Sequence, residues 1–475
     1  MSTNCFHEGL LSHAFLILAT ALVAPPLHAQ DTTVVTGATV IDGTGRDPVT
    51  DASIVIAGGR IVAVGPASGI RIPRHARLIP ARGKFVIPGM MDANVHLVYC
   101  FSVECIARYE ERFEDIIAEA AQVALANGLT TVFDSWGPLE PLSRVRDRIS
   151  RGEIPGSRLY VAGNIIGLTG PFGRDFVAEA EKTTSKPFRD RIDAMWERGT
   201  GPELLWMTPD SVAAAIRQYA ALGMDFLKYA ASGHSYGEML MFSPQQQRAI
   251  VDAGHQAGLV VQTHTTTVES LRQAVEAGVD LMQHCSITGR VPIPDVTIEL
   301  IKRRNVYCAI QSITEARLKS LAPVAAALPR RMYQGELFTV MGENERRLIA
   351  ARAPVLLATD GGITSPDELA ARPDFLKIDP SADLGSGHFL WFQATAEKGM
   401  RPMDAIVAAT SNIAKAYHKD REIGSLEAGK RADLVILDAD PLADITNVRK
   451  IVAVMKDGVL VDRAALPVRR ILTRR

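Results

Sequence analysis

The chain has 475 residues, of which 47% are hydrophobic and 22% charged, and its formal net charge is -1. This composition is typical of a folded globular protein and excludes a disordered or fibrous chain. The near balance of charges, without a long basic block, argues against nucleic acid as a partner.

Residues 1–29 are predicted to be a signal peptide. The apolar run from Ala14 to Ala24 is too short to span a bilayer but suits the hydrophobic region of an export signal, with Ala29 before the cleavage site. Glu8 and Leu27 depart from the usual pattern, and an ordinary unstructured terminus or a misassigned start is the alternative. We therefore expect a periplasmic or secreted chain without stable membrane association.

Five cysteines are present, and Cys5 would leave with the signal. In an oxidising compartment Cys100 and Cys105 can form a disulfide within one loop. Unpaired buried thiols are the alternative, and Cys285 and Cys308 complete the set.

Segments rich in β-formers lie near both ends of the chain, at Thr32–Arg77, Asp433–Leu437 and Ile451–Met455. They predict one small β-sandwich domain assembled from residues 30–86 and 420–465. Residues 87–419 have a different sequence pattern.

In this middle part, short β-rich runs alternate with helices that begin at capping residues. Helices are predicted to begin at Thr208, Ser243 and Thr267, each followed by Pro or an apolar-periodic run. Eight strands alternating with helices predict an α/β fold, a (β/α)8 TIM barrel. The predicted strands are Phe85–Asp92, Thr130–Phe133, Arg158–Ala162, Phe226–Tyr229, Val260–His264, Leu281–His284, Val306–Ile310 and Val355–Thr359.

Five of these strands end at residues that can bind metal: His96, Lys228, His264, His284 and Asp360. The carboxyl ends of parallel barrel strands meet at one rim, so we expect these side chains to converge. Imidazole and carboxylate suit Zn²⁺ or a similar divalent ion. For one histidine alone a structural role is the better interpretation, but not for the whole set.

A lysine fits among metal ligands only when its amine is neutral. Burial beside cations lowers the pKa of Lys228 and favours reaction with carbon dioxide to a carbamate, whose two oxygens can bridge two ions. A surface lysine at a strand end is the alternative. Asp360 is the expected general base for a water molecule activated by the metal.

The chain resembles the amidohydrolase superfamily, in the branch of imidazolonepropionase-like and Xaa-Pro dipeptidase-like enzymes. The matching motifs are Val86–Asp92, the Lys228 strand, Val260–His284, Leu357–Asp360 and Gly424–Leu434. The resemblance implies hydrolysis of a C–N bond in a small molecule. It also implies one or two metal ions held by His96, carbamylated Lys228, His264, His284 and Asp360.

Asn94 stands where that family usually has the first histidine of a His-x-His pair. A carboxamide oxygen is a weaker zinc ligand than imidazole, so the strand-one site should bind metal less tightly. An Asn-x-His start resembles a subgroup that hydrolyses phenylurea and thiocarbamate herbicides. The alternative is that Asn94 only orients His96 through a hydrogen bond.

Three further features concern the substrate. The loop Leu168–Gly173 lacks the histidine of a dipeptidase-like Gly-Gly-His-Gly stretch, which argues against a specific dipeptide. The segment Arg174–Met207 is expected to form a lid, whose Trp196 and Trp206 either line an apolar pocket or pack the lid onto the barrel. Tyr229 is a candidate donor to a substrate carbonyl, although alternation directs it away from Lys228.

Other functions remain as alternatives. A deaminase is disfavoured because Lys228 is present and three threonines follow His264. A phosphotriesterase or lactonase could use the same lysine, and Asn94 suggests a catalytically inactive metal-binding homologue. The substrate, the number and identity of the metals and the presence of a homo-oligomer stay open.

Overall fold

The computed structural model describes residues 32–100, 102–173, 176, 180–234, 238–320, 340–364 and 383–473. The predicted signal peptide and Cys5 lie outside the described residues, as do residues 174, 175 and 177–179 of the expected lid. Within these described ranges, no helix combines the length and apolar character that crossing a bilayer requires.

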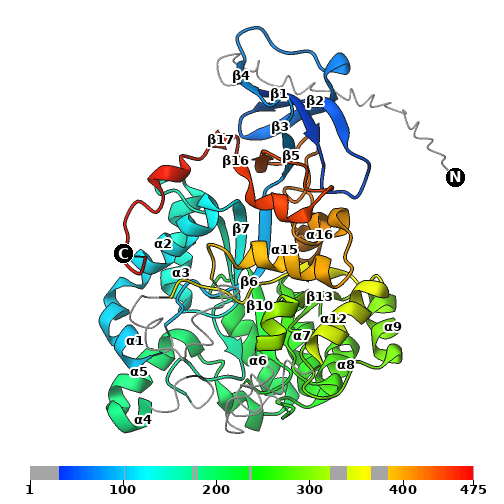
Figure 1. Ribbon diagram of the computed structural model, residues 1–475. Coiled ribbons are helices and arrows are strands. Elements are labelled where there is room, and N and C mark those ends of the chain that lie inside the picture. Colours follow the sequence, from blue (N-terminus) through cyan, green and yellow to red (C-terminus); the bar gives the residue numbers. More distant parts are fainter. Residues whose placement is uncertain are drawn as a thin grey trace, which may run out of the picture.

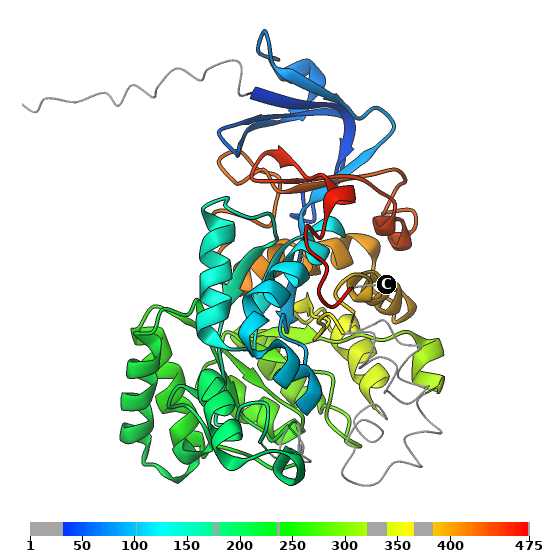
Figure 2. The ribbon, with the colours of Figure 1, turned by 90° about the vertical axis from the view of Figure 1, so that its left-hand side faces the viewer.

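Strands from both ends of the chain pair in one eight-stranded sheet, in the order β17-β16-β15-β5-β1-β2-β3, with β4 paired to β1. Strand β5 joins the two halves, because it pairs parallel with β1 and antiparallel with β15. The sheet lies at one end of the molecule, above the helical part (Figures 1 and 2). Its strands are β1 Thr32–Val40, β2 Val49–Ala57, β3 Arg60–Pro66, β4 Arg77–Pro80, β5 Phe85–Pro88, β15 Leu434–Leu437, β16 Ile451–Lys456 and β17 Val459–Leu460.

The middle of the chain contains two parallel sheets, ordered β6-β7-β8 and β14-β13-β12-β11-β10-β9. Their residues are almost all buried, as expected for parallel strands covered on both faces. The strands are β6 Met90–Val95, β7 Leu129–Asp134, β8 Arg158–Val161, β9 Ile165–Ile166, β10 Phe226–Ala230, β11 Val260–His264, β12 Leu281–Gln283, β13 Tyr307–Ile310 and β14 Val355–Leu357.

Backbone contacts join these two sheets on both sides. Val95 forms a parallel bridge with Gly361, just after β14, and Asp225 N donates to Val161 O at 2.8 Å. The strand predicted at Arg158–Ala162 is β8 Arg158–Val161, and it ends shortly before Gly163, which has a φ of 77°. A Cβ at this position would lie 2.2 Å from Tyr219 Oη, so only glycine fits, and the chain resumes as the short β9.

The helices surround the parallel strands. The three predicted helix starts are confirmed: Thr208, Ser243 and Thr267 each cap a helix with their side chain, and Ser243 and Thr267 form capping boxes. The helices are α1 Val103–Tyr109, α2 Phe113–Ala126, α3 Leu139–Ser150, α4 Ala180–Thr183, α5 Lys186–Glu197, α6 Pro209–Ala220, α7 Pro244–Gln256, α8 Val268–Ala277, α9 Asp295–Arg304, α12 Met341–Ala350, α15 Gly387–Glu397, α16 Pro402–Ala408 and α17 Ser411–Ala416.

Candidate active site

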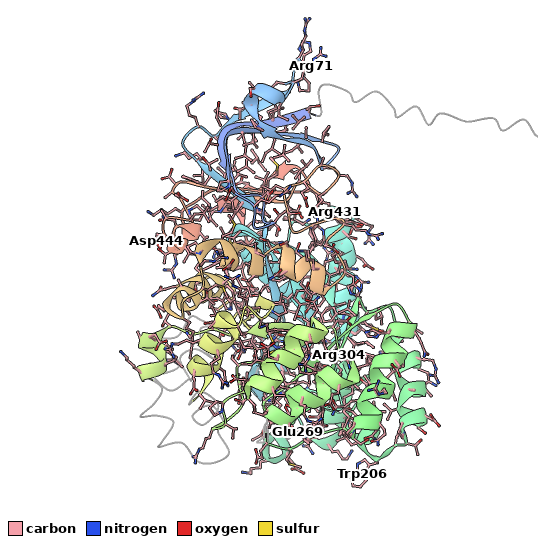
Figure 3. All side chains as sticks on the ribbon, turned by 90° about the vertical axis from the view of Figure 1, so that its right-hand side faces the viewer. Arg71, Trp206, Glu269, Arg304, Arg431 and Asp444 are labelled. Carbon is pink, nitrogen blue, oxygen red and sulfur yellow. A yellow bond between two sulfur atoms is a disulfide. The ribbon has the colours of Figure 1, made fainter. Side chains whose placement is uncertain are left out.

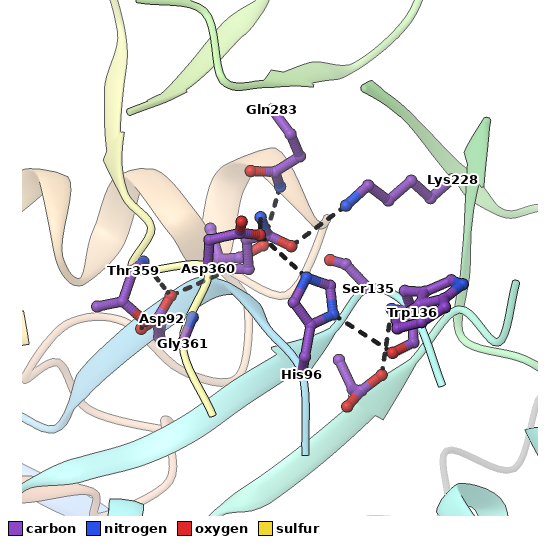
Figure 4. A network of polar contacts seen from close by, with 12 residues as sticks. Asp92, His96, Ser135, Trp136, Lys228, Gln283, Thr359, Asp360 and Gly361 are labelled. Atoms are coloured by element: carbon purple, nitrogen blue, oxygen red, sulfur yellow. Dashed lines mark hydrogen bonds and ion pairs between the residues drawn. The ribbon is translucent and has the colours of Figure 1, made fainter. Parts of the chain in front are cut away.

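Four predicted residues meet in one polar network toward the carboxyl ends of β6, β10 and β14 (Figure 4). His96 Nε2 lies 2.9 Å from Asp360 Oδ1. Asn94 Nδ2 donates to the same oxygen at 2.6 Å, and Lys228 Nζ donates to Asn94 Oδ1 at 3.4 Å. Asn94 therefore orients Asp360 and lies between it and Lys228, whereas the alternative interpretation had it orienting His96.

His264 and His284 form the other half of the site. Their ring centroids are 4.8 Å apart. Both ring nitrogens of His264 are buried and have no hydrogen-bond partner among the described residues. A buried polar atom without a partner is energetically unfavourable, so two such atoms on one side chain indicate a ligand that the folded chain itself does not supply.

The backbone at the site is strained at two of the predicted ligands. His284 and Asp360 have φ values of 63° and 56°, in the left-handed region that side chains with a Cβ rarely adopt. At Asp360, tertiary hydrogen bonds hold this conformation, because Asp360 N donates to Asn94 O at 2.9 Å and His96 N donates to Gly361 O at 2.8 Å.

Asp92 connects the first and last strands beneath the site. Its carboxylate accepts hydrogen bonds from Thr359 Oγ1 at 2.6 Å, Thr359 N at 3.1 Å and Asn94 N at 3.1 Å. Asp134 has a similar role at the end of β7, where it accepts from the amides of Leu97 and Trp136. Both aspartates are fully buried, and burial raises the pKa of Asp92 to about 7 and that of Asp134 to about 6.

The electrostatics favour neutral imidazoles at His264 and His284, an ionised carboxylate at Asp360 and a lowered pKa at Lys228. Burial lowers the pKa of Lys228 to about 8, although the charges of Asp360 and Asp134 oppose this shift. Burial also lowers the pKa of His284 to about 4 and that of His264 well below its usual value. Burial alone would raise the pKa of Asp360, but His284, His96 and Lys228 hold it well below its usual range.

A buried amide layer supports these residues from inside the strands. Gln283 Nε2 donates to Ala93 O at 3.0 Å and to Gln262 Oε1 at 2.6 Å. Tyr417 Oη donates to the same two acceptors, at 2.7 and 2.9 Å. The layer fixes β6 against β11 and β12, and with them the histidines that follow.

Within the described ranges, no group of three or more His, Cys, Asp or Glu side chains is arranged to hold a metal ion. His96 and Asp360 are instead paired with each other. Lys228 is not a His, Cys, Asp or Glu residue, so it does not count toward such a group. The donor set still fits a divalent cation in its chemistry, because it combines neutral imidazoles, one carboxylate and the two unpartnered nitrogens of His264.

Three residues considered for substrate contact lie away from this network: Tyr229, Trp196 and Trp206. Tyr229 is buried and its hydroxyl donates to Gln247 Oε1 on α7 at 3.0 Å, so it faces the helix layer and not the network around Lys228. The cause is strand alternation, which turns Tyr229 to the face opposite Lys228. Trp196 is 1% exposed and packs on Phe113 and Trp136, whereas Trp206 is 91% exposed (Figure 3).

The sequence pattern did not predict a role in the site for Asp92, Asp134 or His234. His234 follows β10, and its ring centroid is 5.5 Å from that of His264. Asp92 was recognisable as a charged residue within an apolar strand, and His234 as a histidine six residues after Lys228 in a strand-end loop.

The loop after β6 is closed by a disulfide. Cys100 and Cys105 are bonded, with their Cα atoms 5.5 Å apart. All four of these cysteines are buried, but Cys285 and Cys308 are free thiols and are not bonded to each other. The bridge lies a few residues after His96, so it restrains the segment that leads from the site into α1.

The sequence matches the amidohydrolase family over residues 85–461. The solved structure of molinate hydrolase has a TM-score of 0.88 and 38% identity, and the match covers 94% of this chain and 98% of the other. Phenylurea hydrolase B has a TM-score of 0.88 and 37% identity, with 94% and 100% covered. Ochratoxinase of Aspergillus niger is 25% identical over 443 residues, which are 89% of this chain and 85% of the relative.

These similarities imply the TIM-barrel fold with an additional domain. The family match includes the strand ends from which the site is built and continues through β15 and β16 of the small sheet. The chain belongs to the amidohydrolase family.

Proposed function

We propose that this protein is a metal-dependent hydrolase that cleaves a C–N bond, of the amide, urea or carbamate type, in a small molecule. The observation that carries the proposal is the convergence of Lys228, His264, His284 and Asp360, with both nitrogens of His264 buried and unpartnered within the described part of the chain. Family membership and the similarity to molinate hydrolase and phenylurea hydrolase B support the reaction class.

His96, Lys228, His264, His284 and Asp360 would hold one or two divalent ions, zinc or a similar metal, with Asn94 as a weak additional ligand. Bound there, the metal would polarise the scissile carbonyl and make a water molecule acidic enough to act as a nucleophile near neutral pH. The lowered pKa of Lys228 supports its conversion to a carbamate, since only the neutral amine reacts with carbon dioxide.

Asp360 is the proposed general base. Its carboxylate is ionised because interactions with His284, His96 and Lys228 hold its pKa well below the usual range, and its side chain is 27% exposed, so water can reach it. After taking the proton of the attacking water, Asp360 is placed to pass it to the departing nitrogen. Asn94 holds the carboxylate in position through its 2.6 Å hydrogen bond.

An ester-cleaving phosphotriesterase or lactonase would use the same residues and stays an alternative to be tested by substrate. An inactive metal-binding homologue is less well supported, because Asp360 lies in the site and its carboxylate is ionised. A screen of N-acyl amino acids, Xaa-Pro dipeptides, phenylureas, carbamates and lactones separates these functions, and turnover of lactones alone would contradict C–N hydrolysis.

Metal analysis tests the centre itself. Purified protein should contain between one and two divalent ions per chain, and Lys228→Ala should remove most of them. Asn94→His should raise the occupancy, because imidazole binds zinc more tightly than a carboxamide. Full activity of metal-free protein would refute the proposal, and unchanged metal content in Asn94→His would show that Asn94 is not a ligand.

We further propose that the parallel strands form a closed (β/α)8 barrel of residues 87–419, and that residues 30–86 and 420–465 form a β-sandwich beside it. The Val95–Gly361 bridge and the pairing of β5 with β15 support this division. Export with cleavage after Ala29 is also proposed, and the Cys100–Cys105 disulfide supports an oxidising compartment. N-terminal sequencing of the mature protein tests the cleavage site.

A further inference from the structure

The loop after β12 begins with His284 and turns sharply at this residue. His284 has a φ of 63°, and its carbonyl accepts a hydrogen bond from Ile287 N at 2.8 Å, which closes the turn. On the side of β13, Cys285 N donates to Ala309 O at 3.3 Å. The His284 ring is attached to this turn, so its direction depends on how the rest of the loop is held.

Asn344 of α12 holds the loop with three hydrogen bonds. Its Nδ2 donates to Ser286 O at 2.9 Å and to Thr288 Oγ1 at 2.7 Å, and its Oδ1 accepts from Ile293 N at 2.9 Å. Asn344 and Ser286 are fully buried. One buried carboxamide therefore fixes the loop from two residues after His284 almost to the start of α9.

The next residue of α12, Glu345, contacts the same loop. Its carboxylate accepts hydrogen bonds from Ser286 Oγ at 3.2 Å and from Ser312 Oγ, after β13, at 2.8 Å. Lys398 lies 3.2 Å from this carboxylate and balances its charge. Two consecutive residues of α12 thus converge on Ser286 and fix the loop after β12 against the loop after β13.

Apolar contacts already attach α12 to the rest of the molecule. Met341 packs with Ile287 and Ile313, and Leu348 belongs to the main core. A buried carboxamide contributes little further stability, because its hydrogen bonds replace bonds to water. Its bonds do fix the distance and direction of the groups that they join, and all three bonds of Asn344 go to the loop that carries His284.

We propose that Asn344 is a positioning residue, which holds the loop after β12 so that the ring of His284 points at the metal centre. The inference rests on the proposed hydrolytic function and deepens it, since it adds a residue of α12 to those that build the metal site. Groups that orient a metal ligand without touching the metal commonly set the affinity of the site.

The test measures the binding of Zn²⁺ and Co²⁺ to metal-free, full-length protein by competition with a chelator. The visible absorption of the Co²⁺-loaded protein reports the geometry of the ligands. The variants are Asn344→Leu, Thr288→Val and, as a matched control, Asn412→Leu. Asn412 donates to Val355 O at 3.3 Å, at the amino end of β14 and hence at the end of the strands opposite the site. The free energy of unfolding is recorded without metal for each variant.

We expect Asn344→Leu to weaken Zn²⁺ binding by about tenfold or more and to alter the Co²⁺ spectrum, because loss of an orienting group disturbs the ligand. Thr288→Val removes one of the three hydrogen bonds and should weaken binding about two- to threefold. Asn412→Leu should bind metal within about twofold of the wild type, whatever stability it loses.

Unchanged affinity and an unchanged Co²⁺ spectrum in Asn344→Leu would overturn the positioning role, and Thr288→Val decides in the same way if Asn344→Leu does not fold. Equal weakening in Asn412→Leu would also overturn it, because the effect would then follow from lost stability alone.

Metal binding and turnover separate this inference from the function beneath it. Weakened metal binding in Asn344→Leu, with no cleavage of any screened amide, urea or carbamate by the metal-loaded wild type, would refute the hydrolase and leave the positioning role. Cleavage by the wild type, with unchanged metal binding in Asn344→Leu, would refute the positioning role and leave the hydrolase.

Discussion

Two of the described lysine side chains in the parallel-stranded part of the molecule are buried, and their surroundings differ. Lys398, just after α15, lies 3.2 Å from Glu345, and both of these side chains are 0% exposed. It also donates to the carbonyls of Ile313 and Ala394. Lys228 is 1% exposed, and among the described residues its amine has one hydrogen bond, of 3.4 Å, with Asn94.

The difference indicates that Lys398 has a structural role, whereas the amine of Lys228 is available for reaction. Glu345 also accepts hydrogen bonds from Ser286 and Ser312, so the ammonium of Lys398 belongs to a satisfied network that links β12, β13 and α12. Lys228 has no comparable network, and burial therefore lowers its pKa to about 8. A buried amine with few partners is unfavourable for the fold but available for reaction.

The largest expected effect is the loss of stability when Lys398 is replaced. Replacing it in Lys398→Met leaves the carboxylate of Glu345 buried without a cation, which should lower the free energy of unfolding by about 3–5 kcal/mol. Denaturant titration measures this change. The double variant Lys398→Met/Glu345→Leu should recover most of it, and a loss below about 1 kcal/mol in the single variant would contradict the structural role.

The opposite sign is expected at Lys228. In metal-free protein at pH 7, in buffer without carbon dioxide, Lys228→Met should raise the free energy of unfolding by up to roughly 3 kcal/mol, because the wild type must keep a poorly solvated ammonium buried. The same variant should have lost its metal and hydrolytic activity. Destabilisation equal to that of Lys398→Met would show that the two lysines do not differ.

The pH dependence of the free energy of unfolding tests the lowered pKa of Lys228 without relying on a single pH value. The pKa of Lys228 is about 8 in the folded protein and near its usual 10.5 when unfolded, so the unfolded chain binds more protons between these values. This group therefore makes the metal-free wild type more stable as the pH rises from 8 to 10.5. The difference between wild type and Lys228→Met should shrink across that window, and a constant difference would contradict the lowered pKa.

The smallest effect concerns the network around Lys398. Ser312→Ala removes the 2.8 Å hydrogen bond to Glu345 and should lower the free energy of unfolding by about 1 kcal/mol. Ser320→Ala, at an exposed position, is the matched control and should leave stability unchanged. Equal effects in the two variants would show that the buried hydrogen bond contributes little.

The strand ends were predictable because the relevant signals are local. Apolar runs followed by His, Lys or Asp identify β10, β11 and β14, and capping residues identify the helices between them. The direction of Tyr229 was predictable in the same way, since strand alternation turns it away from Lys228.

Features that depend on tertiary contacts could not be predicted. The left-handed backbone at Asp360 is held by hydrogen bonds between distant segments, such as that from Asp360 N to Asn94 O. The break between β8 and β9 involves Tyr219 of α6, whose hydroxyl lies against Gly163. The role of Asn94 as a partner of Asp360 likewise depends on a contact across the strands.

The pairing of β5 with β15 has a consequence for how the protein is made. β5 precedes the parallel-stranded part of the chain and β15 follows it, so the sheet that joins them cannot be completed until everything between them has been synthesised. The first strands must therefore wait with an apolar face uncovered while the central helices and strands assemble, which makes chaperone binding during synthesis valuable. A C-terminal truncation would accordingly harm the earliest part of the chain as much as the latest.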